Sequence, residues 1–319
     1  MKKILLLIPL AALLLYPSLS FGQAKVGTAG AQFLEIGVSA RAIGMGEAFL
    51  GVSDDASVLY YNPGALSTIT QIEGIVTHVD YPADINYEFV GVVIPAPSLA
   101  STFGVSLYWL GMDEMNVTNY QNPHGNGQTF RAGDMALGLS YGAGLTDRFS
   151  LGITVKYLNQ RIERARAIGW ASDIGLYYDT GYRNFKICMV LANFGPDMKF
   201  ITEPYPLPID FRFGTSIDVI SSENSRMIFA AQGSHPNDNL EKYNFGIEYW
   251  YNDMFALRTG KKFNYDYYDD SEFAGGMTFG AGLRLPVGFS SVSTVSIDYA
   301  YQDMGWLDTV NRFTFGVKF

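Results

Sequence analysis

The sequence predicts an all-β protein, a 14-stranded antiparallel transmembrane β-barrel with an N-terminal hatch, on the basis of three observations. After residue 70, apolar or aromatic residues alternate with small or polar ones to the end of the chain, as in strands with two unlike faces. Aromatic residues make up 15% of the chain and glycines number 34, a composition that fits poorly with long helices. Connections between the alternating segments are short and long in turn, which is typical of outer-membrane barrels.

Residues 1–22 are predicted to be a secretory signal peptide. Lys2 and Lys3 precede an apolar run from Ile4 to Leu15, and small residues follow as far as Gly22. The run is too short to anchor the chain across a membrane. We therefore expect export from the cytoplasm with cleavage near Gly22.

Residues 23–70 are predicted to form a hatch inside the barrel, because they show no alternation. The stretch from Gly37 to Leu50 is rich in small residues, and Asp54 and Asp55 precede a short helix that ends near Asn62. Eight strands enclose only side chains, whereas sixteen to eighteen leave a channel. A barrel of fourteen strands thus has room for a compact segment of this length.

Residues 71–319 are predicted to form the barrel. The fourteen alternating segments lie near 71–80, 85–95, 101–111, 130–145, 148–160, 168–180, 184–194, 209–220, 225–234, 240–252, 254–263, 273–286, 291–303 and 311–319. Each is long enough for a tilted strand to cross a bilayer. A soluble β-sandwich would show the same alternation, but it has no reason to sort its loops by length. The uncharged run 89–112 is long enough for a transmembrane helix, but its prolines and alternation favour two strands and a turn.

The connections predict the orientation of the barrel. Short turns fall at 95–100, 146–147, 180–183, 221–224, 252–253 and 287–290, and longer loops at 111–129, 160–167, 195–208, 233–239, 264–272 and 303–310. Outer-membrane barrels have short periplasmic turns and long outer loops. We therefore expect an outer-membrane location with both chain ends in the periplasm.

Charged residues on the strands are predicted to point into the lumen, because an Arg on the lipid face costs about 2–4 kcal/mol near the midplane. The inward set is Lys156, Asp173, Lys186, Arg212, Asp218, Glu248, Arg258, Arg284 and Asp298. We interpret most of them as structural ion pairs. The expected contacts between hatch and lumen involve Arg41, Asp54, Asp55, Asn62, Arg212 and Arg284.

No chemistry of an enzyme or a cofactor is predicted. The single cysteine, Cys188, excludes a disulfide within the chain, and a net charge of −9 argues against nucleic acid as a partner. The three histidines are too dispersed for metal-ligand spacing. The acidic run 265–272 offers ligands for Ca²⁺ but lacks EF-hand spacing, so a solvated loop is favoured. The arginines of 161–166 suit either lipopolysaccharide phosphates or solvent.

The N-terminal motifs add a family resemblance. The runs Ala40-Arg-Ala-Ile-Gly-Met-Gly-Glu-Ala-Phe49, Ser53-Asp-Asp-Ala-Ser57 and Tyr60-Tyr-Asn-Pro-Gly-Ala-Leu66, with Asn193-Phe-Gly-Pro196, Lys199-Phe200 and Pro206-Leu-Pro208 downstream, resemble the PorV/PorQ family, which is similar to FadL-type transporters with an N-terminal hatch. This resemblance implies a type IX secretion component that binds translocon and cargo proteins. FadL-like uptake of a hydrophobic small molecule and a purely structural role in the outer-membrane lipid are the alternatives. We expect loops 111–129 and 195–208 to bind partners through exposed Tyr120, Phe200 and Tyr205.

Overall fold

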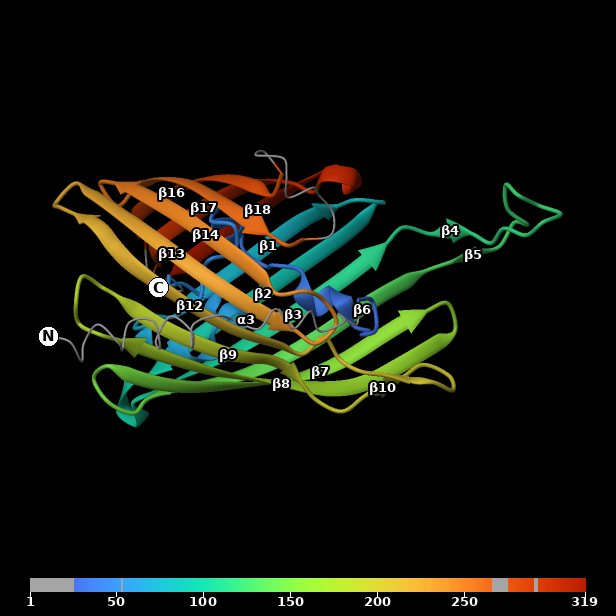
Figure 1. The fold of residues 1–319 in the computed structure, drawn as a ribbon, viewed down its shortest axis with the longest axis horizontal. Helices are drawn as coiled ribbons and strands as arrows, with labels where there is room; N and C mark the ends of the chain where they lie inside the picture. The colour runs from blue at the N-terminus through green and yellow to red at the C-terminus, as the bar shows by residue number, and fades with distance from the viewer. Residues whose placement is uncertain (1–25, 53, 266–274, 290–291) are drawn as a thin grey trace, which may run out of the picture.

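Fourteen antiparallel strands form a closed barrel in the computed structural model, which describes residues 26–52, 54–265, 275–289 and 292–319 (Figure 1). The strands are β1 (Glu73–Tyr81), β2 (Ile85–Ala96), β3 (Ser101–Met112), β6 (Ala132–Gly144), β7 (Phe149–Ile162), β8 (Ala165–Asp179), β9 (Lys186–Phe194), β12 (Asp210–Ser221), β13 (Ser225–Pro236), β14 (Lys242–Tyr251), β15 (Phe255–Phe263), β16 (Met277–Phe289), β17 (Val292–Asp303) and β18 (Thr309–Lys318). Neighbours in sequence pair in order, and β1 pairs with β18 to close the sheet. Closure leaves no edge of the sheet unpaired along the wall, as lipid requires. The predicted signal peptide and residues 266–272 of the acidic run lie outside the described residues.

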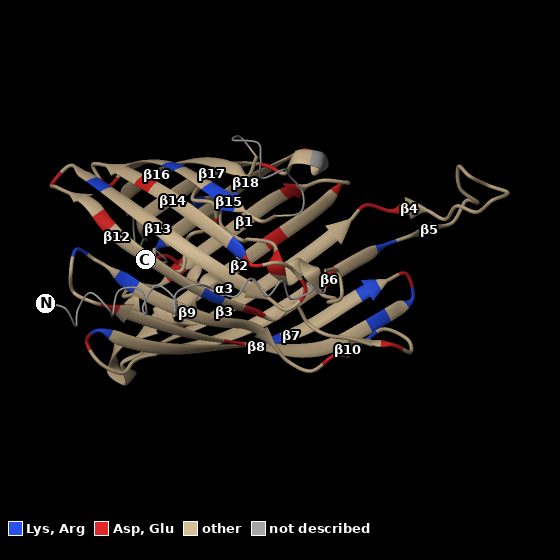
Figure 2. Ribbon diagram, in the orientation of Figure 1, with Lys and Arg blue, Asp and Glu red and all other residues tan. Residues whose placement is uncertain are grey.

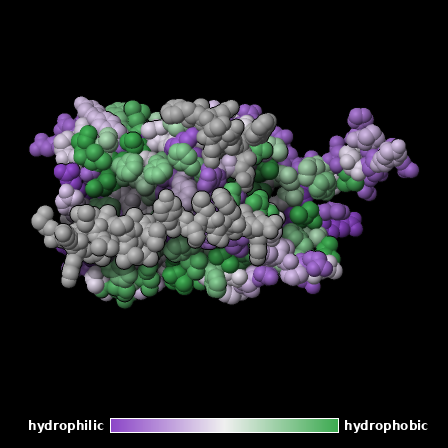
Figure 3. All heavy atoms as spheres, viewed as in Figure 1, coloured by the Kyte–Doolittle hydropathy of each residue, from purple (hydrophilic) through white to green (hydrophobic). Residues whose placement is uncertain are grey.

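The strands show the predicted alternation between two faces. On β7, Leu151, Ile153 and Val155 are exposed on the outside, whereas Thr154 and Lys156 are buried on the inside. Of the nine charged residues predicted to point inward, seven are buried, and Lys186 and Arg284 are half-buried. Figure 2 shows few charged residues along the strands, and Figure 3 shows hydrophobic residues over much of the barrel side.

The uncharged run 89–112 forms parts of β2 and β3, joined by the 3₁₀ helix η3 (Pro97–Leu99). The prediction of two strands and a turn is therefore confirmed. In the part of the chain that the structure describes, no helix is long and apolar enough to cross a membrane.

The two ends of the barrel differ, and we name them by their connections. The turn end carries the connections at 97–100, 145–148, 180–185, 222–224 and 252–254, and the loop end carries those at 82–84, 113–131, 163–164, 195–209, 237–241 and 304–308. A two-stranded ribbon of β4 (Met115–Asn116) and β5 (Thr129–Phe130) extends from the loop end beyond the barrel (Figure 1). We call residues 113–131 the arm. A second ribbon at this end pairs β10 (Met198–Lys199) with β11 (Pro204–Tyr205).

One predicted long loop is wrong. Residues 160–167 do not form a loop, because β7 and β8 continue through them and leave a connection of only two residues, Glu163 and Arg164. Glu163 adopts a left-handed backbone conformation (φ 52°), as tight hairpin turns require. The β7–β8 hairpin therefore stands higher at the loop end than β9, which ends at Phe194.

Residues 31–69, which we call the lumen segment, lie against the inner face of the wall. This segment contains η1 (Gln32–Glu35), α2 (Ala40–Gly44), α3 (Val58–Tyr61) and η2 (Pro63–Thr68). Two of these helices have side-chain caps: the Ser39 hydroxyl accepts from Ala42 N at the start of α2, and the Asn62 side chain accepts from Gly64 N at the start of η2. Phe49 and Tyr61 of the segment join the wall residues Tyr87, Phe89 and Tyr108 in one buried core.

Glycines on both surfaces allow the lumen segment to approach the wall closely. A Cβ added to Gly260 of β15 would lie 2.1 Å from Gly46 N, and one added to Gly152 of β7 would lie 2.0 Å from Pro63 O. Gly46 itself has a positive φ (63°) that other residues rarely adopt. Part of the glycine excess therefore serves backbone-to-backbone packing inside the barrel.

The described residues begin and end at opposite ends of the barrel. Gly27 N donates to Asp238 O in the β13–β14 connection at the loop end, whereas Phe319 N donates to Ile72 O at the turn end. Residues 1–25 lie outside the described part of the chain, so the expectation that both chain ends lie in the periplasm stays a prediction. The segment enters at the loop end and runs the length of the lumen before β1 begins.

Candidate functional site

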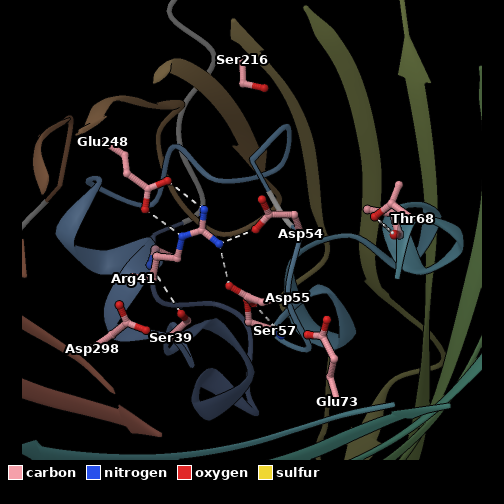
Figure 4. Close-up of polar contacts among 12 residues, drawn as sticks. Ser39, Arg41, Asp54, Asp55, Ser57, Thr68, Glu73, Ser216, Glu248 and Asp298 are labelled. Carbon is pink, nitrogen blue, oxygen red and sulfur yellow. Dashed lines mark hydrogen bonds and ion pairs between the residues drawn. The ribbon is translucent and has the colours of Figure 1, made fainter. Parts of the chain in front are cut away.

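The buried guanidinium of Arg41 is the main polar link between the lumen segment and the wall (Figure 4). Its Nε and Nη2 each donate to one carboxylate oxygen of Glu248 on β14, both at 2.8 Å. Its Nη1 donates to Asp55 at 2.9 Å and also to Asp54. Arg41 thus binds two carboxylates of its own segment and one of the wall, and the bidentate geometry fixes its orientation.

The network continues into the wall. Glu248 accepts from Arg258 of β15 at 2.6 Å, and Arg258 in turn pairs with Asp298 of β17 at 2.6 Å. Burial raises the pKa of the Asp54 carboxyl, but the attraction of Arg41 outweighs burial and the net pKa is lowered. The carboxylate of Asp54 is therefore held in its charged form by Arg41.

Arg284 and Arg212 make contacts other than those of the Arg41 network. Arg284 lies over the ring of Trp250 at 4.4 Å, and it has no ion-pair partner among the described residues. Arg212 pairs with Asp210 of its own strand at 2.6 Å and lies over the ring of Tyr60 at 5.7 Å. Each guanidinium therefore packs on an aromatic face, and Arg212 meets the lumen segment through Tyr60.

Asn62 joins the segment to β8 near the turn end. Its Nδ2 donates to Leu176 O at 3.3 Å, while its Oδ1 accepts from Gly64 N at 2.9 Å. The structure thus brings Arg41, Asp54 and Asp55 together and places Asn62 apart from them. The functional role assigned to these residues stays a prediction.

A second ion pair between segment and wall was not predicted from the sequence. Glu47 pairs with Lys262 of β15 at 2.6 Å, and Glu35 lies 3.6 Å from Lys242 of β14. Burial raises the pKa of Glu47, but attraction to Lys262 dominates and the net pKa is lowered. Lys262 shares an inward face with Arg258, so strand parity alone could have identified the wall partner but not Glu47.

The predicted partner-binding residues separate into two kinds. Tyr120 at the tip of the arm is fully exposed. Phe200 and Tyr205, in contrast, are half-buried and stack on each other at 5.8 Å. Tyr205 donates to Gln160 Oε1 at 3.0 Å, and its ring covers Gly30. The expectation that Phe200 and Tyr205 are exposed is wrong, because 195–208 folds inward over the lumen segment.

Two open cavities lie on either side of the lumen segment. The cavity at the loop end has a volume of about 520 Å³. Its lining mixes charged residues with apolar and aromatic ones, among them Glu47, Lys262, Phe33, Ile36, Leu110 and Met304. The cavity at the turn end has a volume of about 620 Å³ and is lined mainly by hydroxyl-bearing and charged side chains. Within the described ranges, no group of three or more His, Cys, Asp or Glu residues is arranged to hold a metal ion.

Comparison with known proteins decides the family. Residues 20–234 match the family model described as the type IX secretion system protein PorV. The chain belongs to the PorV family. A search of curated proteins found no match.

Solved structures similar to this PorV-family chain share its fold. They include the Pseudomonas putida toluene transporter TodX (TM-score 0.57, 11% identity, covering 88% of this chain and 97% of that one). They also include the Ralstonia pickettii toluene transporter TbuX (0.55, 12%, 88% and 97%) and a Pseudomonas aeruginosa FadL homologue (0.54, 12%, 88% and 98%). At this identity the likeness extends to the fold alone. The PorV-family chain is therefore an outer-membrane β-barrel with FadL-like architecture.

Proposed function

We propose that this PorV-family chain serves type IX secretion as a closed outer-membrane barrel that binds translocon and cargo proteins at its loop end. The match of residues 20–234 to the PorV family is the observation that carries this proposal. In it, the loop end faces outward, in keeping with the position of long loops in outer-membrane barrels. The barrel acts as a docking partner, and no catalytic step is assigned to it.

In this proposal residues 23–70 act as a hatch. The ion pairs of Arg41 with Glu248 and of Glu47 with Lys262 attach the segment to β14 and β15. At Gly152 and Gly260 the two backbones approach so closely that a Cβ would not fit between them. A lumen filled in this way suits a protein that receives other proteins on its surface rather than passing solutes.

The arm is the favoured contact for partner proteins. From Met115 to Phe130 it carries no charged residue, and Tyr120 is exposed at its tip among asparagines and glutamines. Protein-binding loops are enriched in Tyr and Asn, and the centre of an interface is depleted of charge. The 195–208 connection supports the loop end from within and contributes fewer exposed side chains.

The test is an arm deletion in a strain that uses this barrel. Residues 115–130 are replaced by a short Gly-Ser turn, and cargo export and copurification of translocon proteins are measured. We expect cargo to accumulate in the periplasm and copurification to fall, while the barrel still migrates as a folded, heat-modifiable species. A matched control replaces exposed Tyr182 at the turn end by alanine, which should leave export unchanged. Normal export without the arm would contradict the proposal.

A FadL-like channel is the second candidate, favoured by the fold shared with the two toluene transporters. Such a channel needs an apolar path past the lumen segment. At the loop end, charged residues such as Glu47 and Lys262 interrupt the apolar part of the cavity lining, which weighs against such a path. Saturable binding of toluene or a fatty acid by the purified barrel, lost when Phe33 is replaced by aspartate, would favour uptake over secretion.

A further inference from the structure

An open hollow of about 550 Å³ lies on the outer wall of the barrel at the loop end. Its lining holds two arginines, Arg131 at the base of the arm and Arg161 near the top of β7, together with two acidic residues and several uncharged ones: Glu114, Asp134, Trp109, Gly133 and Asn159. The hollow belongs neither to the lumen nor to the tip of the arm. Figure 2 shows basic residues at the right-hand, loop-end tips of the lower strands, with acidic residues close to them.

The strand register explains why the hollow forms there. The row nearest the loop end holds Gly111, Gly133, Arg161 and Arg166 on β3, β6, β7 and β8. The next row toward the turn end holds Trp109, Met135, Asn159 and Ile168, and the row after that holds Leu107, Leu137, Tyr157 and Trp170. Because the two glycines carry no side chain, the first row leaves a gap beside its two arginines.

The rows below the hollow form an apolar and aromatic surface. Trp109, Tyr157 and Trp170 are exposed on the outside of the barrel, as are Leu107 and Leu137. Aromatic girdles of outer-membrane barrels lie at the level where hydrocarbon meets the headgroups. The hollow and its arginines therefore stand at the level of the lipid headgroups.

Arg161 lines the hollow, and Arg166 lies next to it across the β7–β8 pair, just outside the lining. Arg131 pairs with Glu114 at 2.7 Å, and the half-buried Asp134 accepts from Gln160 at 3.0 Å. Arg161 donates through Nε to the Glu163 carbonyl, and Arg166 donates through Nε to the Asn159 amide at 2.6 Å. Among the described residues, neither Arg161 nor Arg166 has a carboxylate partner, so the remaining guanidinium donors face solvent.

We propose that this hollow binds the phosphorylated headgroup of an outer-leaflet lipid of the lipopolysaccharide type. Arg161 and Arg166 bind phosphate, since the planar guanidinium matches phosphate oxygens bidentately. The acyl chains lie along Leu107, Leu137 and Tyr157 on the row below. The proposal rests on the outward orientation of the loop end given above, but not on any role in secretion.

The test is lipid binding by the full-length, detergent-purified barrel, measured by native mass spectrometry. Lipid A is compared with dephosphorylated lipid A and with phosphatidylglycerol. In the Arg161→Gln/Arg166→Gln double variant we expect lipid A affinity to fall at least tenfold, because each charge-assisted bond is worth about a factor of ten or more. The matched control is Arg164→Gln, which removes a 95% exposed arginine of the same hairpin that lies near a carboxylate, that of Glu163, and outside the row of Arg161 and Arg166. It should change affinity less than about twofold.

A second variant keeps the test independent of charge and folding. Gly133→Leu fills the hollow without altering any arginine and should weaken lipid A binding while the barrel remains heat-modifiable. Unchanged lipid A affinity in the double variant, or equal affinity for phosphatidylglycerol, would overturn the lipid site. Orientation is read separately, by surface labelling of His124→Cys on the exposed arm, and cargo export is a third readout. If lipid A affinity is unchanged in the double variant while surface labelling and cargo export are normal, this inference alone fails and the proposed function stands.

Discussion

Replacing Arg41 by methionine is expected to destabilise the barrel by about 3 kcal/mol. Removing one partner of a buried ion pair costs roughly 3–5 kcal/mol, because the other charge is left buried and unpaired. Here Glu248 keeps Arg258 at 2.6 Å, whereas Asp54 and Asp55 lose the one arginine with which each pairs among the described residues. Their side chains are 34% and 20% exposed, so water recovers part of the loss. We therefore expect the lower end of the range.

The assay is urea unfolding of the protein reconstituted in lipid vesicles. Tryptophan fluorescence is a suitable signal because the Arg41 guanidinium lies 5.8 Å from the ring of Trp250. The variant should unfold at lower urea than the wild type with a similar slope. Arg41→Lys, which keeps the charge but not the bidentate geometry, should lose less, about 1–2 kcal/mol.

Two results would refute this reasoning. If Arg41→Met unfolded within about 0.5 kcal/mol of the wild type, the network would contribute nothing beyond an ordinary surface substitution. If Arg164→Gln, which removes an exposed arginine from the β7–β8 turn, cost as much, the loss would reflect net charge rather than the buried contacts.

The remaining predictions concern pH, packing and the loop end. The pKa values of Asp54 and Glu47 are lowered from their ordinary 3.8 and 4.5. Their contribution to stability is therefore fully present above about pH 4.5 and is lost as the pH falls through this range and below. Urea midpoints measured from pH 7 to pH 3 should decline, and they should decline less steeply in Arg41→Met. Gly260→Ala should lower the free energy of unfolding by about 1–3 kcal/mol, because the new Cβ would lie 2.1 Å from Gly46 N. The control Gly74→Ala should lower it less, because its Cβ would lie 3.4 Å from the nearest atom. Equal urea midpoints for the two variants would contradict the close packing. Tyr205→Ala should lower stability by about 1–2 kcal/mol through loss of the Phe200 stack and the Gln160 hydrogen bond. Tyr120→Ala should leave the urea midpoint unchanged, because the side chain is fully exposed, while it reduces copurification of partner proteins.

The wall of the barrel was predictable because strand geometry is local. Side chains alternate with a period of two, so Lys156, Glu248 and Arg258 could be assigned to the lumen from their neighbours in sequence. The number of strands and the closed sheet follow from the same pattern together with the sorted connections. The ion pairs of Arg41 with Asp54 and Asp55 could also be predicted from the sequence, because these residues share one short segment.

The loop end was less predictable because its conformation depends on contacts distant in sequence. Phe200 and Tyr205 lie in a polar, proline-rich connection, and only the meeting of Tyr205 with Gly30 and Gln160 shows that it folds inward. The arrangement of Glu47 with Lys262 has the same origin, since 215 positions of sequence separate the two. Side-chain periodicity carries no information about which loop covers which opening.

The polar and backbone contacts in the lumen fix the position of the lumen segment along the barrel more than they add to the stability of the protein. A purely apolar surface between segment and wall would bury as much area at several heights along the barrel, because apolar contacts have no direction. The bidentate pairing of Arg41 with Glu248 and the backbone contact of Gly46 with Gly260 each permit one height only. Buried ion pairs often add little net stability, but they can fix register. The position of the lumen segment also sets the position of Gly30 beneath the ring of Tyr205, and so supports the shape of the loop end from within.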